Sequence, residues 1–290
     1  MLLGLLMTFA DGTRCTCVAL AVLALTAASP VARAGEEKPL WEVGAGIGVF
    51  TLPAYRGAAQ NADFVLPVPY FTYHGDFFKA DRHGIRGSFF DSDRLDLTVS
   101  LFLSPPGGSE DIDARAGMPD LKATFEIGPQ LDFTLWRSES GARYLKLRMP
   151  LRAAFTVEGP PKDVGWLFQP NLNLDITDLP GLPAWNLGLV AGPVFANQRQ
   201  NAYYYDVAPQ YATPSRPAYE ASAGYAGMQY LAGMSRRFQK IWVGAFVSYN
   251  NMSGTVVADS PLVLEKHNFG AGLAVSWIFG ESSTRVMVND

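Results

Sequence analysis

The sequence predicts an all-β fold, a transmembrane antiparallel up-and-down β-barrel of about 12 strands, with 10 strands as the alternative. Three observations lead to this prediction. Apolar residues alternate with small or polar residues at a period of two through most of the chain. Most alternating segments are long enough to cross a bilayer as tilted strands. The chain begins with a leader typical of secreted proteins.

The leader, residues 1–34, has the pattern of a cleaved signal peptide. An apolar run at 17–28 follows Arg14, and an Ala-x-Ala motif ends at Ala34, so we expect cleavage after Ala34. The run is too short for a membrane-spanning helix. Both cysteines of the chain lie in this leader, so the mature chain would have no disulfide and no thiol site.

The mature chain would be moderately acidic. The formal net charge is −4 for the whole chain and becomes −5 without the two arginines and one aspartate of the leader, which argues against a nucleic-acid partner. No later run is long and apolar enough for a spanning helix, so a membrane would be crossed by strands. We expect residues 35–279 to form the barrel and 280–290 to be a C-terminal tail.

The last regular segment, residues 267–279, shows the pattern most clearly. One face is apolar and carries the aromatic residues Phe269, Trp277 and Phe279, whereas the other face is small or weakly polar. This suits a strand with lipid outside and a wet lumen inside. We expect it to close the barrel. Because the chain continues past Phe279, we expect the signal read by the assembly machinery to lie internally, at 270–279.

The other expected strands alternate in the same way. They are 40–50, 63–73, 94–103, 122–135, 143–156, 166–177, 184–196, 219–232 and 239–250. Glycines break residues 76–90 into short pieces. If these pieces are two short strands, the barrel has 12 strands. If they are part of the rim, the barrel has 10. Long connections alternate with short ones, as expected for outer loops and periplasmic turns.

A soluble β-sandwich or lipocalin-like barrel is the structural alternative. It would also alternate, but it would bury the apolar face and expose the charged one. Alternation alone does not say which face is which. Strand length, aromatic residues near the strand ends and the secretory leader favour the membrane barrel.

Charged residues would line the lumen on two neighbouring strands. Glu126 and Asp132 share a face of one strand, and Lys146, Arg148 and Arg152 share the matching face of the next. On the lipid side such charges would cost about 2–4 kcal/mol each near the midplane. We favour a salt-bridge lattice that stiffens the lumen. The alternative is a selectivity surface for a small polar or charged solute.

Nothing in the sequence indicates catalysis, a cofactor or a metal site. The histidines are His74, His83 and His267, and none has the close serine partner of a hydrolase. The carboxylates Glu110, Asp111 and Asp113 cluster on an expected outer loop. They lack the spacing and glycine of an EF-hand loop, so we expect them to be solvated.

A set of sequence blocks resembles the MltA-interacting protein family, also called MipA/OmpV. The main block is ARAGMPDL at 114–121, followed by EIGP at 126–129. The signature residues are Arg115, Gly117, Met118, Pro119 and Asp120. Further blocks lie on both sides of the main block, in the family's order, at 44–48, 55–57, 65–70, 192–193, 203–207 and 219–225. One departure is Arg56, which stands where proline is more familiar.

The resemblance implies an outer-membrane protein of a Gram-negative bacterium. Some members join a murein transglycosylase to a penicillin-binding protein, and others are described as porin-like, osmotically regulated or adhesive. We therefore expect a non-enzymatic platform surrounded by outer-membrane lipid and lipopolysaccharide. A narrow porin-like channel for small polar or charged solutes is the alternative, because fold alone does not choose between functions.

Overall fold

The computed structural model describes residues 36–75, 78–81, 84–87, 94–107 and 109–288, which belong to one compact unit. Most of these residues lie in two antiparallel sheets, one of 13 strands and one of two. In this part of the chain, no helix has the length and apolarity that crossing a membrane requires. The expected leader, residues 1–34, and its cleavage site at Ala34 lie outside the described residues.

The described strands follow the alternating segments of the sequence. They are β1 (Glu36–Pro39), β2 (Trp41–Pro53), β3 (Asn61–His74), β4 (Phe78–Asp81), β5 (Gly84–Gly87), β6 (Leu95–Ser104), β7 (Thr124–Arg137), β8 (Arg143–Thr156), β9 (Asp163–Phe168), β10 (Asn171–Ile176), β11 (Trp185–Ala196), β12 (Gly224–Phe238), β13 (Ile241–Asn251), β14 (His267–Glu281) and β15 (Arg285–Val288). The helices are η1 (Ser109–Asp111), η2 (Asp113–Arg115), α1 (Gln198–Tyr205) and η3 (Pro209–Tyr211).

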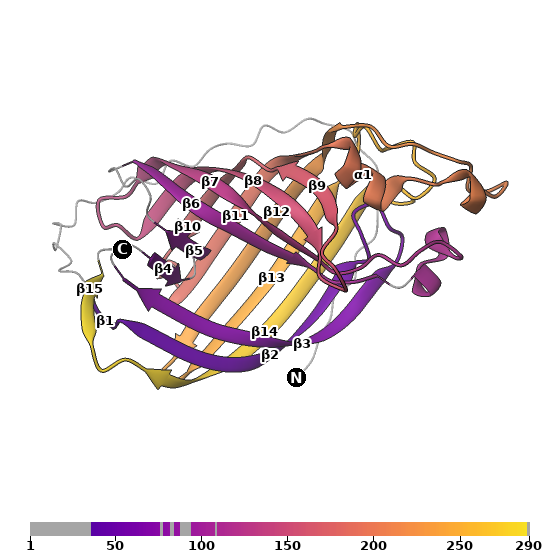
Figure 1. Cartoon of the computed structure of the whole chain (residues 1–290). Helices are drawn as coiled ribbons and strands as arrows, with labels where there is room; N and C mark the ends of the chain where they lie inside the picture. Colours follow the sequence, from indigo (N-terminus) through magenta and orange to yellow (C-terminus); the bar gives the residue numbers. More distant parts are fainter. Residues whose placement is uncertain (1–35, 76–77, 82–83, 88–93, 108, 289–290) are drawn as a thin grey trace, which may run out of the picture. The chain divides into compact units, whose positions relative to one another are not determined.

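The large sheet curves round and meets itself (Figure 1). Its order is β5-β4-β3-β2-β14-β13-β12-β11-β10-β8-β7-β6. The strand β9 pairs with the same two neighbours as β10, namely β8 and β11, so β9 and β10 together fill one position. The two ends of this order, β5 and β6, contact each other. The described sheet thus has twelve positions, and the prediction of an antiparallel up-and-down barrel is confirmed.

The faces of β14 show which way the barrel is turned. Phe269, Trp277 and Phe279 are exposed at 66%, 61% and 55%, whereas Asn268 and Ser276 are buried. The apolar face therefore points outward and the small or polar face points into the lumen. A soluble sandwich or lipocalin would have the opposite arrangement, so this burial pattern excludes that alternative.

The two ends of the barrel differ in their connections. At one end the strands are joined by short turns, such as the one between Phe238 and Ile241. At the other end lie the long connections 54–60, 105–123, 197–223 and 252–266. Single-chain bacterial barrels keep short turns in the periplasm and long loops outside. The long connections, with α1, therefore mark the outer end, and β1 and β15 lie at the opposite, periplasmic end (Figure 1).

Three details differ from the expected strands. The segment 166–177 is two strands, because Gln169 and Pro170 interrupt it between β9 and β10, and proline has no N–H to donate to the ladder. The strand expected from 219 begins at Gly224. The connection after β11, expected to be a loop, contains the helix α1.

Residues 285–288 of the expected tail form a two-stranded ribbon with the start of the described chain. β15 pairs antiparallel with β1, with Glu37 opposite Met287. The ribbon continues the β2–β14 pair, because the Leu40 N–H donates to the Thr284 carbonyl at 2.9 Å. His74 Nδ1 donates to the Pro39 carbonyl at 3.0 Å and ties the ribbon to the end of β3. Among the described strands, none pairs with the far edge of β15.

Candidate functional site

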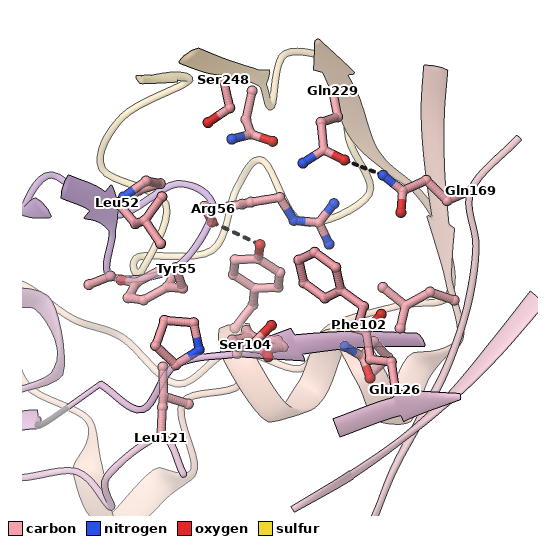
Figure 2. Close-up of a pocket in the computed structure, with 18 of the residues that line it drawn as sticks. Leu52, Tyr55, Arg56, Phe102, Ser104, Leu121, Glu126, Gln169, Gln229 and Ser248 are labelled. Carbon is pink, nitrogen blue, oxygen red and sulfur yellow. Dashed lines mark hydrogen bonds between the residues drawn. The ribbon is translucent and has the colours of Figure 1, made fainter. Parts of the chain in front are cut away.

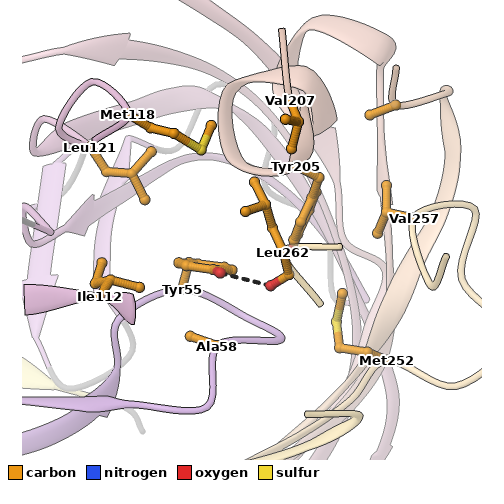
Figure 3. Close-up of a cluster of buried hydrophobic side chains, with 11 residues drawn as sticks. Tyr55, Ala58, Ile112, Met118, Leu121, Tyr205, Val207, Met252, Val257 and Leu262 are labelled. Carbon is orange, nitrogen blue, oxygen red and sulfur yellow. Dashed lines mark hydrogen bonds between the residues drawn. The ribbon is translucent and has the colours of Figure 1, made fainter. Parts of the chain in front are cut away.

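The outer end of the barrel is covered by a packed assembly of loops. We call residues 54–60, 109–123, 197–223 and 252–266 the cap. Their buried apolar side chains form one cluster: Tyr55, Ala58, Ile112, Met118, Leu121, Tyr205, Val207, Ala221, Met252, Val257 and Leu262 (Figure 3). Each of the four segments contributes to it, so burial of this apolar surface holds the loops together.

Two tyrosine hydroxyls link separate segments of the cap. Tyr55 donates to the Leu262 carbonyl at 2.7 Å (Figure 3), and Tyr205 donates to the Arg56 carbonyl at 2.8 Å. The two rings pack edge to face with centroids 6.1 Å apart. A buried tyrosine needs a partner for its hydroxyl, and here each partner is a carbonyl of another segment.

The helix α1 is placed on the barrel wall by a capping residue. The Asn197 side chain accepts hydrogen bonds from the N–H groups of Gln200 in α1 and Trp166 in β9, at 3.0 and 3.1 Å. Gly165 makes this approach feasible, because it has φ +120° and a Cβ there would lie 2.3 Å from Asn197 Oδ1. The N-cap thus joins the helix to the wall.

The family-signature residues lie in the cap. The Arg115 guanidinium is buried and donates to the carbonyls of Tyr204 and Pro119 at 3.0 and 3.1 Å. This burial lowers the pKa of Arg115. Asp120 accepts from the Ser109 N–H at 2.7 Å. Met118 joins the apolar cluster, and Gly117 has φ +76°, a conformation that favours glycine.

Paired charges occupy the lumen beneath the cap. Arg152 Nε lies 2.8 Å from Glu126 Oε2, and both side chains are buried. Lys146 is 3.8 Å from Asp96, and Arg148 is 3.6 Å from Asp175. The expected basic row therefore finds acidic partners on three strands, β6, β7 and β10, rather than on β7 alone.

Arg152 is the centre of a hydrogen-bond network. Besides Glu126, it donates to Ser100 Oγ at 3.2 Å and to Gln169 Oε1 at 2.6 Å. Gln169 in turn donates to Gln229, which extends the network from β7 to β12 (Figure 2). Asp132 faces the same lumen and accepts from Gln130 at 2.8 Å. Gln169, which lies in the interruption between β9 and β10, links Arg152 to Gln229.

The sequence reasoning missed a further ion pair near the periplasmic end. Arg237 Nη1 lies 2.6 Å from Glu42 Oε1, and the Glu42 side chain is 3% exposed. Thr72 also donates to Glu42, at 3.2 Å. A glutamate on the otherwise glycine-rich face of residues 40–50 was the available signal. Its partner, Arg237, is remote in the sequence, so the pairing could not be predicted.

A cavity of about 180 Å³ lies where the cap meets the lumen wall. Its lining comes from the cap residues Arg56, Lys122 and Tyr205 and from barrel residues such as Glu126 and Arg152. Figure 2 shows Arg56 and Glu126 in this lining. Neither Gln200 nor Asn250, which also line it, was singled out by the sequence. Among the described residues, no group of histidine, cysteine and carboxylate side chains is placed to hold a metal ion.

The cap tyrosines predict that the cap loses stability above pH 10. Burial raises the pKa values of Tyr203 and Tyr205 to about 12, from an ordinary value of 10.0. The folded cap therefore favours the neutral hydroxyls, so their stabilising contribution is complete below pH 10 and is lost as the pH rises to about 12. Tyrosinate absorbance and proteolysis of the cap should change together over this range. Ionisation of every tyrosine near pH 10 with an intact cap would contradict this prediction.

The lipid-facing apolar wall, polar lumen, short turns and long outer loops define an outer-membrane β-barrel protein. The family model for the MltA-interacting protein MipA matches residues 45–279. The chain therefore belongs to the MltA-interacting protein (MipA) family, and the resemblance noted in its sequence blocks is confirmed.

The chain is similar to several outer-membrane proteins. The outer membrane protein OmpV of Vibrio cholerae is 24% identical over 215 residues, which are 72% of this chain and 76% of that protein. A bacterial polysaccharide outer membrane secretin has a TM-score of 0.40 at 9% identity, covering 82% of this chain and 99% of its own. The outer membrane phospholipase A of Escherichia coli has a TM-score of 0.34 at 11% identity, covering 80% and 92%.

Proposed function

We propose that this protein is a non-enzymatic platform that holds a murein transglycosylase at the periplasmic face of the outer membrane. The family description names an interaction with MltA, a murein transglycosylase. The observation that carries the proposal is the contrast between the two ends of the barrel. The outer end is covered by the cap, and the lumen holds paired charges. The periplasmic end carries the β1–β15 ribbon.

The ribbon is the surface we assign to the partner. Met287 is 63% exposed, and the far edge of β15 pairs with no other described strand. An open strand edge recognises an extended segment of another chain through main-chain hydrogen bonds. The short turns add little area, and a stable interface needs about 800 Å² on each partner, so the ribbon would be its centre.

The platform is tested with a chain that lacks residues 285–290. We expect this deletion to leave the barrel folded, because β15 pairs only with β1, outside the large sheet. Binding of a purified murein transglycosylase, measured by biolayer interferometry on barrels in lipid nanodiscs, should weaken at least about tenfold. Heat-modifiable electrophoretic mobility verifies folding.

Arg199→Gln is the matched control. Arg199 forms an exposed ion pair with Asp163 at the outer end, so binding should not change. Failure of the full-length barrel to bind any transglycosylase would overturn the platform. If the chain lacking residues 285–290 binds the transglycosylase as tightly as the full-length barrel, the interface does not include the ribbon.

A narrow channel is the second candidate, favoured by the cavity under the cap and the charges below it. The lumen cations Lys146, Arg148, Arg152 and Arg237 are each paired with a carboxylate. Such neutralised charges favour the stiffening lattice over a conducting path. Planar-bilayer recordings distinguish the two. Conductance steps with the unaltered barrel would support a channel, and their absence with unchanged solute uptake in a deletion strain would remove it.

A further inference from the structure

The cavity between the cap and the lumen wall has an excess of positive charge. Three cations line it, Arg56, Lys122 and Arg152, against one carboxylate, Glu126. That carboxylate is already paired with Arg152 at 2.8 Å. No carboxylate among the described residues forms an ion pair with Arg56 or Lys122. Two cations are therefore available to an anion from outside the protein.

Arg56 is positioned to reach such an anion. It follows β2, and its guanidinium extends into the cavity toward Gln229 and Phe102 (Figure 2). The side chain is half-buried, so water screens its charge less than at an open surface. Lys122 also lines the cavity and is exposed to solvent.

The same cavity contains acceptors that lack donors. Gln200 Oε1 and Asn250 Oδ1 are buried and have no hydrogen-bond partner, and both side chains line the cavity. Leaving a buried acceptor unsatisfied costs about 1–3 kcal/mol, so such atoms indicate a missing donor. The hydroxyl groups of a ligand would supply that donor, whereas a bare inorganic anion would not.

The remaining lining and the volume limit what fits. Phe102 and Leu167 offer an apolar wall, and Ser104 and Ser248 offer hydroxyls. At about 180 Å³ the cavity is smaller than the roughly 300–1,000 Å³ sites of drug-sized ligands. A compact ring with several hydroxyl groups and one anionic group matches both the size and the chemistry.

We propose that this cavity binds a hydroxylated organic anion of monosaccharide size, such as a sugar acid or a sugar phosphate. Arg56 and Lys122 bind its anionic group, and Gln200 and Asn250 accept hydrogen bonds from its hydroxyls. The site lies at the outer end of the barrel, and it does not depend on the platform at the periplasmic end.

The test measures binding of three probes by isothermal titration calorimetry to the full-length barrel in detergent micelles. The probes are glucuronate, glucose 6-phosphate and glucose, which carry a carboxylate, a phosphate and no charge. At least one of the two anions should bind with a Kd of about 1 mM or tighter, and glucose at least about tenfold more weakly. The two anions distinguish a sugar acid from a sugar phosphate.

Side-chain variants identify the site. Arg56→Gln and Lys122→Gln should each weaken binding of the anion at least about tenfold. Both variants should fold, because they keep the main-chain carbonyls that accept from Tyr205 at 2.8 Å and Tyr203 at 3.0 Å. Glutamine at position 56 also keeps a side-chain donor for Tyr205, to which the Arg56 side chain is hydrogen-bonded. Arg199→Gln, outside the cavity, should leave binding unchanged.

Three results would overturn the proposal: no binding of either anion, equal binding of glucose, or unchanged binding in Arg56→Gln. Loss of transglycosylase binding in the ribbon deletion has no bearing on this site, so the two proposals fail separately.

Discussion

Replacing Glu126 with alanine is expected to lower the free energy of unfolding of the barrel by about 3–5 kcal/mol. Glu126 and Arg152 are 4% and 8% exposed, so the substitution leaves a buried guanidinium without its carboxylate. Ser100 and Gln169 would remain as neutral acceptors, which do not offset a buried charge. Urea unfolding in lipid vesicles, followed by tryptophan fluorescence, measures the change.

Two controls separate burial from charge. Arg199→Ala breaks the exposed pair with Asp163 and should change the free energy of unfolding by no more than about 1 kcal/mol. The double substitution of Glu126 by leucine and Arg152 by methionine removes both charges and should recover most of the loss. Equal losses in Glu126→Ala and Arg199→Ala would show that the lumen pair is solvated.

Replacing Tyr205 with alanine is expected to open the cap while the barrel wall stays folded. The ring is 2% exposed, and removing a buried aromatic side chain costs about 3–5 kcal/mol. This loss falls on the loops, because the cluster around Tyr205 consists of cap residues. Trypsin should then cleave after Arg199 within minutes, and the thermal unfolding temperature of the wall should change little.

Tyr205→Phe is the matched variant for this experiment. It keeps the ring and removes only the hydroxyl that donates to the Arg56 carbonyl, a loss of about 1 kcal/mol. The phenylalanine variant should resist trypsin nearly as well as the unaltered protein. Comparable resistance of Tyr205→Ala would mean that packing of this ring does not hold the cap closed.

The barrel wall could be predicted from sequence because lipid and lumen impose opposite demands on successive residues. In β14 this gives an unbroken alternation between Phe269 and Phe279, and the structure preserves it. The weaker pieces at 76–90 became β4 and β5, which favours the count of 12 over 10. The glycines in this segment predicted that the two strands would be short.

The cap could not be predicted, because its contacts join loops that are far apart in the sequence and have no periodic residue pattern. The helix α1 reads QRQNAYYY and has no apolar stripe of its own. Its position depends on Asn197 reaching the wall beside Gly165, a contact between residues 32 positions apart. Tertiary packing, rather than local propensity, fixes this helix.

The sequence predicted only the part of the candidate site that lies on the barrel wall. Glu126 and Arg152 share a lumen face on neighbouring strands, so their meeting follows from strand register. Arg148 pairs instead with Asp175 on the strand at its other side, a choice that side-chain geometry makes. The cavity lining depends on the cap, so the sequence did not indicate that Arg56 and Lys122 line one cavity.

The seam between β2 and β14 has a consequence for assembly. Thr51 pairs with Ala271, whereas every other pair around the large sheet joins strands that are close in sequence. The hydrogen-bonding edge of β2 therefore stays open until the last long strand arrives. An open edge can pair with other chains, and closing so long a loop has a large entropy cost. We therefore expect closure of this seam to be the slow step in assembly of the barrel.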